Sequence, residues 1–135
     1  MAPGTPLRVL SDTITVRVDP EETGGAFAVL EEVTPPGAGV PPHVHDRTDE
    51  TFVVLDGEAE FSCGARTIRG GRGTVVFVPR GTPHAFRNAG KTPLRQIVTL
   101  TPPDFVRFFQ AVHDAAASDP AAVMALAQGH DIRFV

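Results

Sequence analysis

The chain has 135 residues, of which 41% are hydrophobic and 21% charged, as expected for one globular domain. Its formal net charge of −4 disfavours a nucleic-acid partner, because binding phosphates requires a basic face. No apolar stretch reaches the roughly 18 residues of a membrane helix, and a single cysteine, Cys63, excludes an internal disulfide. We therefore expect a soluble, single-domain protein of the cytoplasm with no nucleic-acid or membrane partner.

Short apolar runs separated by glycine and proline fill most of the chain. Thirteen glycines and thirteen prolines are spread along the sequence, a pattern typical of an all-β barrel or sandwich. The barrel is expected over about residues 7–100. The predicted strands are, in chain order, Thr13–Val18, Phe27–Val33, Thr51–Leu55, Ala59–Cys63, Arg66–Ile68, Thr74–Val78, His84–Arg87 and Arg95–Leu100.

After Leu100 the periodicity becomes helical. A start signal at Thr101–Asp104 combines a hydroxyl cap, prolines and an acidic residue. It is followed by an apolar stripe on one helix face, at Phe105, Phe108, Phe109, Val112 and Ala116. We interpret this stripe as core packing against the outside of the barrel, and a lid over a substrate is the alternative.

A second helix is predicted from Pro120 to Gln128. Ser118 and Asp119 precede it as caps, and Gly129 follows it as a C-terminal stop. The helical cap therefore covers about residues 103–128. The end of the chain, 131–135, is a candidate last strand.

Histidines provide the most informative chemistry. The prolines in the segment Pro41–His45 favour an extended chain, in which side chains two apart point to the same side with Cα atoms roughly 6.6 Å apart. His43 and His45 therefore face one side. Glu50 begins one of the next strands and His84 begins another. Three imidazoles and one carboxylate are a donor set suited to divalent Fe, Mn, Ni, Co, Cu or Zn.

The spacing of these residues is more specific than their chemistry. One run has intervals of five, one, four and six residues between Gly37, His43, His45, Glu50 and Gly57. Another has intervals of five, one, two and three residues between Gly73, Pro79, Gly81, His84 and Asn88. The two runs resemble the two sequence motifs of the cupin superfamily at every signature position.

This resemblance implies an all-β fold, a cupin jelly-roll β-barrel, which is followed here by two C-terminal α-helices. The whole chain, residues 1–135, would form a single cupin domain. The resemblance also implies that a divalent transition metal lies inside the barrel mouth, with His43, His45, Glu50 and His84 as its ligands.

Strand alternation indicates which side chains surround such a metal. Phe52 and Val54 share the face of Glu50, and Phe86 shares the face of His84. We expect these three side chains to form the walls of a substrate pocket, and plain barrel packing is the alternative reading.

Glu50 is the candidate catalytic residue. An ion bound by three neutral imidazoles and one carboxylate lowers the pKa of a bound hydroxyl, which favours enolate ligands. A carboxylate is able to swing off the ion and accept the proton of the arriving hydroxyl, so Glu50 is the expected general base.

Outside the motifs, the chain resembles the quercetin-dioxygenase-like group of small bacterial cupins. The similar segments are PPHVHDR at 41–47, VPRGTPHAFRN at 78–88, and a tail that joins a Phe-rich helix at 104–113 to a closing segment at 129–135. This resemblance implies a metal-dependent dioxygenase that acts on a small flavonol or enol-type molecule and on dioxygen.

Two alternative functions stay open at this point. One is a non-oxidative metal-dependent cyclase, isomerase or lyase in a biosynthetic pathway. The other is a cupin that binds a metal and a small ligand without turnover. In each case we expect a homodimer, because small cupins commonly pair through edge strands and these edges carry no obvious charge barrier.

Overall fold

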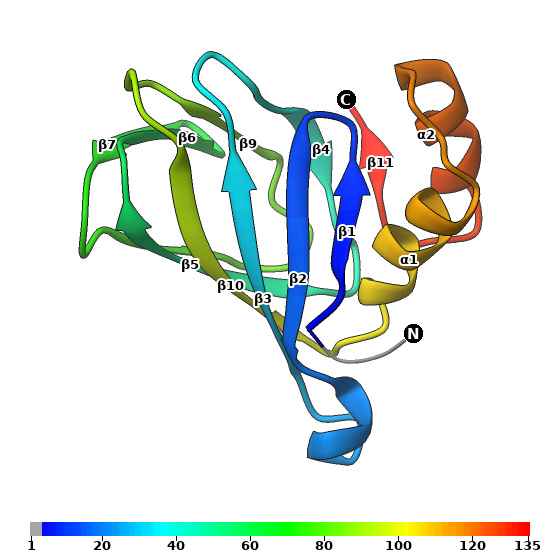
Figure 1. Cartoon of the computed structure of the whole chain (residues 1–135). Coiled ribbons are helices and arrows are strands. Elements are labelled where there is room, and N and C mark those ends of the chain that lie inside the picture. The colour runs from blue at the N-terminus through cyan, green and yellow to red at the C-terminus, as the bar shows by residue number, and fades with distance from the viewer. Residues whose placement is uncertain (1–3) are drawn as a thin grey trace.

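Two antiparallel sheets form the body of the computed structural model, which describes residues 4–135 (Figure 1). The larger sheet has, in spatial order, β1 (Pro6–Val9), β2 (Asp12–Val18), β3 (Ala28–Thr34), β10 (Leu94–Thr101), β5 (Asp49–Asp56) and β8 (Val75–Val78). The smaller sheet has β11 (Arg133–Phe134), β4 (Gly39–Val44), β9 (His84–Asn88), β6 (Ala59–Cys63) and β7 (Arg66–Gly70). Within residues 4–135 these ladders form two separate sheets and do not close into one barrel. The jelly-roll fold is confirmed in this open form.

The predicted strands are all present, with ends that differ from the prediction by at most two residues. The candidate strand at the end of the chain is confirmed as β11, which pairs with β4. β1 was not predicted, because its four residues begin with a proline and give almost no alternation to detect. A short 3-10 helix, Pro20–Thr23, joins β2 to β3.

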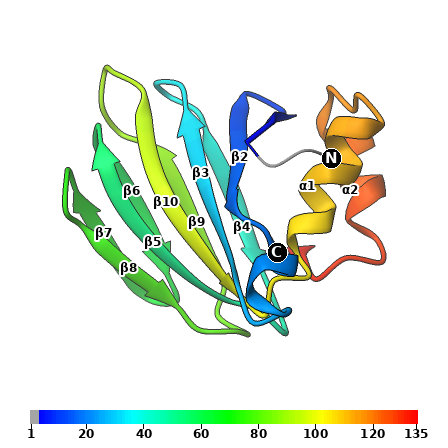
Figure 2. The same cartoon turned by 60° about the horizontal axis from the view of Figure 1, so that its bottom comes forward.

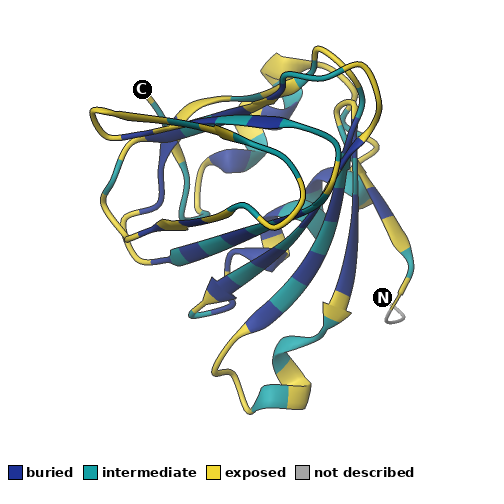
Figure 3. Ribbon diagram, turned by 90° about the vertical axis from the view of Figure 1, so that its left-hand side faces the viewer, coloured by how far each residue is buried: buried dark blue, intermediate teal, exposed yellow. Residues whose placement is uncertain are grey.

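The core lies between the two sheets. Side chains alternate between buried and less buried positions along the strands, as the striped ribbons show (Figure 3). Phe61, Leu30 and Leu94 are among the largest fully buried side chains. Burial of each such side chain contributes about 1.5–3 kcal/mol to folding. The sequence thus encodes the sandwich mainly through this alternation.

The two helices lie beside each other at the side of the sandwich that β1 and β11 form (Figures 1 and 2). They are α1 (Val106–Asp114) and α2 (Pro120–Ala127). α2 begins as predicted, because the Asp119 carboxylate accepts a hydrogen bond of 2.8 Å from the backbone N–H of Ala122. In the part of the chain that the structure describes, no helix has the length and hydropathy of a membrane span.

The first helix differs from its prediction in two ways. It begins at Val106 rather than near residue 103, because the preceding residues form tighter turns in which Val106 N–H bonds to the Pro103 carbonyl. Core packing of the apolar stripe is confirmed, because Phe105, Phe108 and Val112 are buried in the core. The sheets on which they pack do not form a closed barrel. Phe105, Phe108 and Phe109 also line a cavity beside the helix, so they have the covering position of the alternative as well.

Candidate metal centre

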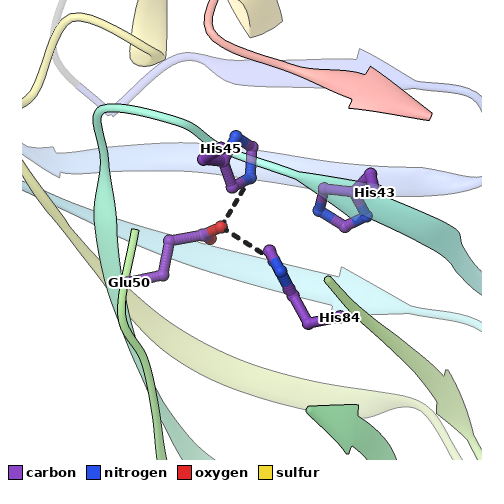
Figure 4. A group of neighbouring side chains, drawn as sticks. All are labelled: His43, His45, Glu50 and His84. Atoms are coloured by element: carbon purple, nitrogen blue, oxygen red, sulfur yellow. Dashed lines mark hydrogen bonds and ion pairs between the residues drawn. The ribbon is translucent and has the colours of Figure 1, made fainter. Parts of the chain in front are cut away.

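Four side chains from three strand regions meet at one point between the sheets (Figure 4). His43 lies in β4, His45 follows its last residue, Glu50 lies in β5, and His84 begins β9. All four are buried, and their candidate ligand atoms lie within 4.8 Å of one another. His43 and His84 are register partners on adjacent strands, which brings residues 41 apart in sequence into contact. We call these four side chains the metal centre.

Each imidazole of the metal centre is held by a backbone carbonyl. The Nδ1–O distances are 2.8 Å for His43 to Pro41, 2.6 Å for His45 to Asp131 and 2.9 Å for His84 to Thr82. A carbonyl only accepts hydrogen bonds, so each Nδ1 carries the proton and donates it. Nε2 is then the nitrogen that is left to face the other ligands, which is the arrangement of metal-binding histidines.

Glu50 is ionised at neutral pH. Its Oε1 lies 2.6 Å from Nε2 of His45 and 3.2 Å from Nε2 of His84. Burial alone would raise the pKa of Glu50, but hydrogen bonds and positive charge from His45 and His84 outweigh burial and lower this pKa to about 2. The metal centre therefore supplies one negative charge in a desolvated place.

The imidazoles differ in their affinity for protons. Burial, followed by the charges of His84 and His45, lowers the pKa of His43 to about 4, so His43 is neutral at neutral pH. Burial also opposes the charging of His45, but the hydrogen bond and charge of Glu50 raise the pKa of His45 above its usual value. The raised pKa of His45 thus favours a proton between His45 and Glu50, at the point where a bound cation would contact both side chains.

The donor set fits a divalent transition metal. It combines three imidazole nitrogens with one carboxylate, which are suitable ligands for borderline divalent ions. It contains none of the thiolates that are typical of a closed structural zinc site. Entry of an ion would displace the proton that His45 and Glu50 share. The metal centre is therefore able to hold a metal ion, and the ligand types leave its identity open among the predicted metals.

Asp131 supports the metal centre from the C-terminal tail. Its carbonyl accepts the hydrogen bond of His45, and its carboxylate accepts from the backbone N–H groups of Asp46 and Arg47, each at 2.9 Å. The Thr48 hydroxyl donates to the same carboxylate at 2.6 Å. Asp131 thus fixes the turn that separates His45 from Glu50. Sequence analysis missed this role, because no local pattern links a tail residue to a turn 83 residues earlier.

A cavity of about 300 Å³ adjoins the metal centre. His43, His45 and Glu50 line it, whereas His84 lies behind its wall. The volume is at the lower end of the range for small-molecule sites, which indicates a small ligand.

The predicted pocket residues occupy different places relative to this cavity. Phe52 and Phe86 line the cavity, with ring centroids 5.8 Å apart. Val54 is buried in the core and is not a lining residue. Val54 lies one pleat repeat beyond Phe52 on the same face of β5, beside its register partner Gln96 of β10. Val54 therefore packs in the core, which was the alternative reading, and does not line this cavity.

Phe105 forms another wall that sequence analysis had assigned to packing. Its ring centroid lies 4.3 Å from that of His45, and its side chain is 3% exposed. Phe109 and Phe108 stack around it at 5.0 and 5.4 Å. The first helix thus shields the metal centre from solvent.

Two acidic side chains, Asp12 and Glu32, also line the cavity, and sequence analysis missed both. Burial, then a hydrogen bond with Asp12 and the charges of Asp12 and Glu50, raise the pKa of Glu32 well above its usual value. The buried position of Glu32 could have been predicted from strand alternation, because Glu32 shares the inward face of its strand with Ala28 and Leu30.

Comparison with known proteins agrees with the fold. The family model described as "Cupin domain" matches residues 30–100, which is more than half of the chain. The chain belongs to the cupin family. The structure of a predicted oxalate decarboxylase from Thermotoga maritima matches 73% of this cupin and 92% of that chain, with 24% identity and a TM-score of 0.68.

Two enzymes share more sequence with this cupin over shorter regions. Quercetin 2,3-dioxygenase of Bacillus subtilis is 33% identical over 73 residues, which cover 54% of this cupin and 22% of the enzyme. The structure of the DMSP lyase DddQ from Ruegeria pomeroyi is 35% identical, with a TM-score of 0.52, and covers 57% of this cupin and 39% of the lyase. This cupin spans 16% to 61% of the length of the curated relatives compared with it.

Proposed function

We propose that this cupin is a metal-dependent enzyme that acts on a small enol-type molecule, with dioxygen as the co-substrate. One observation carries the proposal: the metal centre lies at a buried, mostly apolar cavity of about 300 Å³. The similarity to quercetin 2,3-dioxygenase over about half of the chain supports the oxidative reaction. The proposed substrates are flavonols and related enols.

Glu50 is the proposed general base. A divalent ion at the metal centre would supply Lewis acidity that lowers the pKa of an enol hydroxyl. Glu50 is ionised and reaches the cavity, so its carboxylate is placed to accept the hydroxyl proton. The resulting enolate is more electron-rich than the enol and hence more reactive towards dioxygen.

The imidazoles and the apolar walls have complementary tasks. The carbonyl hydrogen bonds of His43, His45 and His84 fix the three rings before any ligand arrives. Phe52, Phe86 and Phe105 exclude water, which strengthens the electrostatic interactions of Glu50.

A non-oxidative lyase or isomerase is the second candidate. The 35% identity with the DMSP lyase DddQ supports it, because that protein shares the fold and is named a lyase rather than a dioxygenase. The same general base would serve this reaction, since elimination and isomerisation also begin with the removal of a proton.

An oxygen-electrode screen tests the proposal. The protein, loaded separately with Fe, Mn, Ni, Co, Cu or Zn, is mixed with flavonols and 1,2-diketones in their enol form. We expect oxygen uptake that is matched by substrate loss with at least one redox-active metal. Substrate loss without oxygen uptake would instead identify the lyase or isomerase. Tight substrate binding without loss would show a binding protein and would overturn the enzymatic proposal.

We also propose a homodimer that forms through β8, an edge strand of the larger sheet. Its outward side chains Val75 and Phe77 are 61% and 55% exposed, which leaves an apolar edge for a second copy of the chain. Light scattering should then give twice the chain mass of 14.3 kDa. A monomer that persists at high concentration would refute this assembly.

A further inference from the structure

A second polar cluster lies on the inward faces of the larger sheet. Asp12 of β2 and Glu32 of β3 line the cavity, and both are at most 7% exposed. The Thr34 hydroxyl donates a hydrogen bond of 3.0 Å to Asp12. Burial, followed by the neighbouring Asp12 carboxyl, raises the pKa of Glu32 well above its usual value, which favours the protonated form of Glu32. We call these two carboxyls the Asp12–Glu32 pair.

Gln96 is an independent sign that this cluster lacks a partner. It is the direct neighbour of Glu32 across β3 and β10, and it lies on the same inward face. Its side chain is 0% exposed, yet neither Oε1 nor Nε2 has a hydrogen-bond partner among the described residues. Amide groups buried this deeply are normally paired, so Gln96 places a donor and an acceptor without a protein partner, among the described residues, beside Glu32.

The charges that line the cavity indicate which kind of ligand group it favours. Among the described residues, no lysine or arginine lines the cavity, whereas Asp12, Glu32 and Glu50 all do. Burial and the neighbouring carboxyls raise the pKa of Glu32, so the pair holds a proton that a cation would replace. The cluster therefore has hydrogen-bond acceptors and negative charge in excess, and it lacks a donor with positive charge.

The Asp12–Glu32 pair is separated from the metal centre along the strands. Across β10, Glu50 is level with Ala28 of β3, because both pair with Leu100. Glu32 is four residues further along β3, or roughly 13 Å at the Cα positions. The cavity thus has two polar regions with apolar walls between them.

We propose that the Asp12–Glu32 pair anchors a protonated amine of the substrate, while the metal centre holds the enol group of the same molecule. The inference rests on the proposed function only for the enol group. An ammonium has three N–H donors, which match the carboxylate oxygens of Asp12 and Glu32 that line the cavity. When the amine binds, the proton of Glu32 leaves to solvent and the two carboxylates flank the cation. The substrate class is accordingly a small enol with an amino group at its other end.

Titration with two probes of equal chain length tests the amine site without metal or turnover. The probes are n-hexylammonium and n-hexanol, and the dissociation constant of each is measured by NMR with the full chain. We expect the wild-type protein to bind hexylammonium at least about tenfold more tightly than hexanol, as charge-assisted hydrogen bonds are the stronger ones. Equal affinities, or tighter binding of hexanol, would overturn the inference whatever the variants do.

Three variants then locate the selectivity. Asp12→Asn and Glu32→Gln keep size and shape, and each should reduce the preference for hexylammonium to within about twofold while leaving hexanol binding unchanged. The double variant Glu21→Gln/Asp114→Asn removes the same kind of charge from exposed positions and should keep the full preference. Retention of the preference in both Asp12→Asn and Glu32→Gln would place the amine elsewhere.

These outcomes separate the inference from the proposed reaction. Amine selectivity that depends on Asp12 and Glu32, together with a failed oxygen screen, would retain the anchor and remove the dioxygenase. Oxygen uptake with no amine selectivity would do the reverse.

Discussion

The metal centre and the Asp12–Glu32 pair share one cavity, but the chain satisfies their polar atoms in different ways. In the metal centre, each imidazole has a backbone carbonyl that fixes its ring, and Glu50 is bonded to two of the rings. In the other region burial and a neighbouring carboxyl raise the pKa of Glu32, and the Gln96 amide lacks partners among the described residues. The difference teaches that the first region is preorganised for an ion of fixed geometry, whereas the second awaits a group that the ligand brings.

The phenylalanine wall next to the metal centre should have the largest effect on stability. Phe105→Ala removes a buried ring that lies 4.3 Å from His45, and we expect the free energy of unfolding to fall by about 3–5 kcal/mol. Urea denaturation measures this loss. Phe27→Ala, which removes a ring that is 39% exposed, is the control and should change it far less. Equal losses in the two variants would show that Phe105 is not part of the core.

Loss of the general base should have the largest effect on catalysis. Glu50→Gln keeps a neutral oxygen donor in the metal centre but removes the proton acceptor, so turnover should fall about 100-fold or more while some metal is retained. The rate is measured with the enol that the oxygen screen identifies, and Glu58→Gln on the exposed surface serves as the control. An active Glu50→Gln enzyme would assign proton removal to another group.

The C-terminal support should have a moderate effect on metal affinity. Asp131→Ala removes the carboxylate that orders residues 46–48, so His45 and Glu50 lose their fixed separation. We expect metal affinity to fall by about tenfold to 100-fold, as for other groups that orient ligands. Competition with a fluorescent chelator measures it, with Asp114→Ala as the control. Affinity within twofold of wild type would show that the turn holds without Asp131.

The pH dependence of stability should show the smallest effect, and its sign differs between the two regions. Glu50 has a lowered pKa, so its contribution is complete above its ordinary value of 4.5 and is lost as pH falls towards about 2. Glu32 has a raised pKa, so its protonated form stabilises the fold at low pH, and this contribution is lost as pH rises through the raised value. Glu32→Gln should therefore flatten the decline in stability at rising pH.

Thermal unfolding of the metal-free protein over a pH series measures this slope. Identical slopes for wild type and Glu32→Gln would mean that Glu32 releases its proton in the folded state much as it does in the unfolded chain. That result would also count against a protonated Glu32 beside Asp12.

The sheets were predictable because alternation and turn chemistry are local. Asp56-Gly57 illustrates this: Gly57 has a φ of +87°, and a Cβ at that position would lie 2.6 Å from the Pro93 carbonyl. The place of α1 was not predictable, since an apolar stripe looks the same whether it covers a closed barrel or the open side of two sheets. In the structure the helix covers the open side of the two sheets, and the cavity lies between them.

The two regions of the cavity also differ in how far sequence predicts them. His43, His45, Glu50 and His84 fall at the signature positions of the two sequence motifs, so their spacing alone singles them out, and the structure brings the four side chains together. The Asp12–Glu32 pair arises from the register of β2 against β3, which sequence alone does not define. The inward face of Glu32 was nevertheless detectable, since a charged residue there interrupts an apolar series.

Elemental analysis of the protein purified without added metal tests the central claim most directly. The account predicts about one divalent transition ion per chain in the wild type. It also predicts a several-fold lower content in His84→Ala, with an unchanged circular dichroism spectrum, because removal of one buried ligand opens the set without removing the sheets. Equal metal content in the wild type and His84→Ala, or no transition metal in either after incubation with each ion, would contradict it.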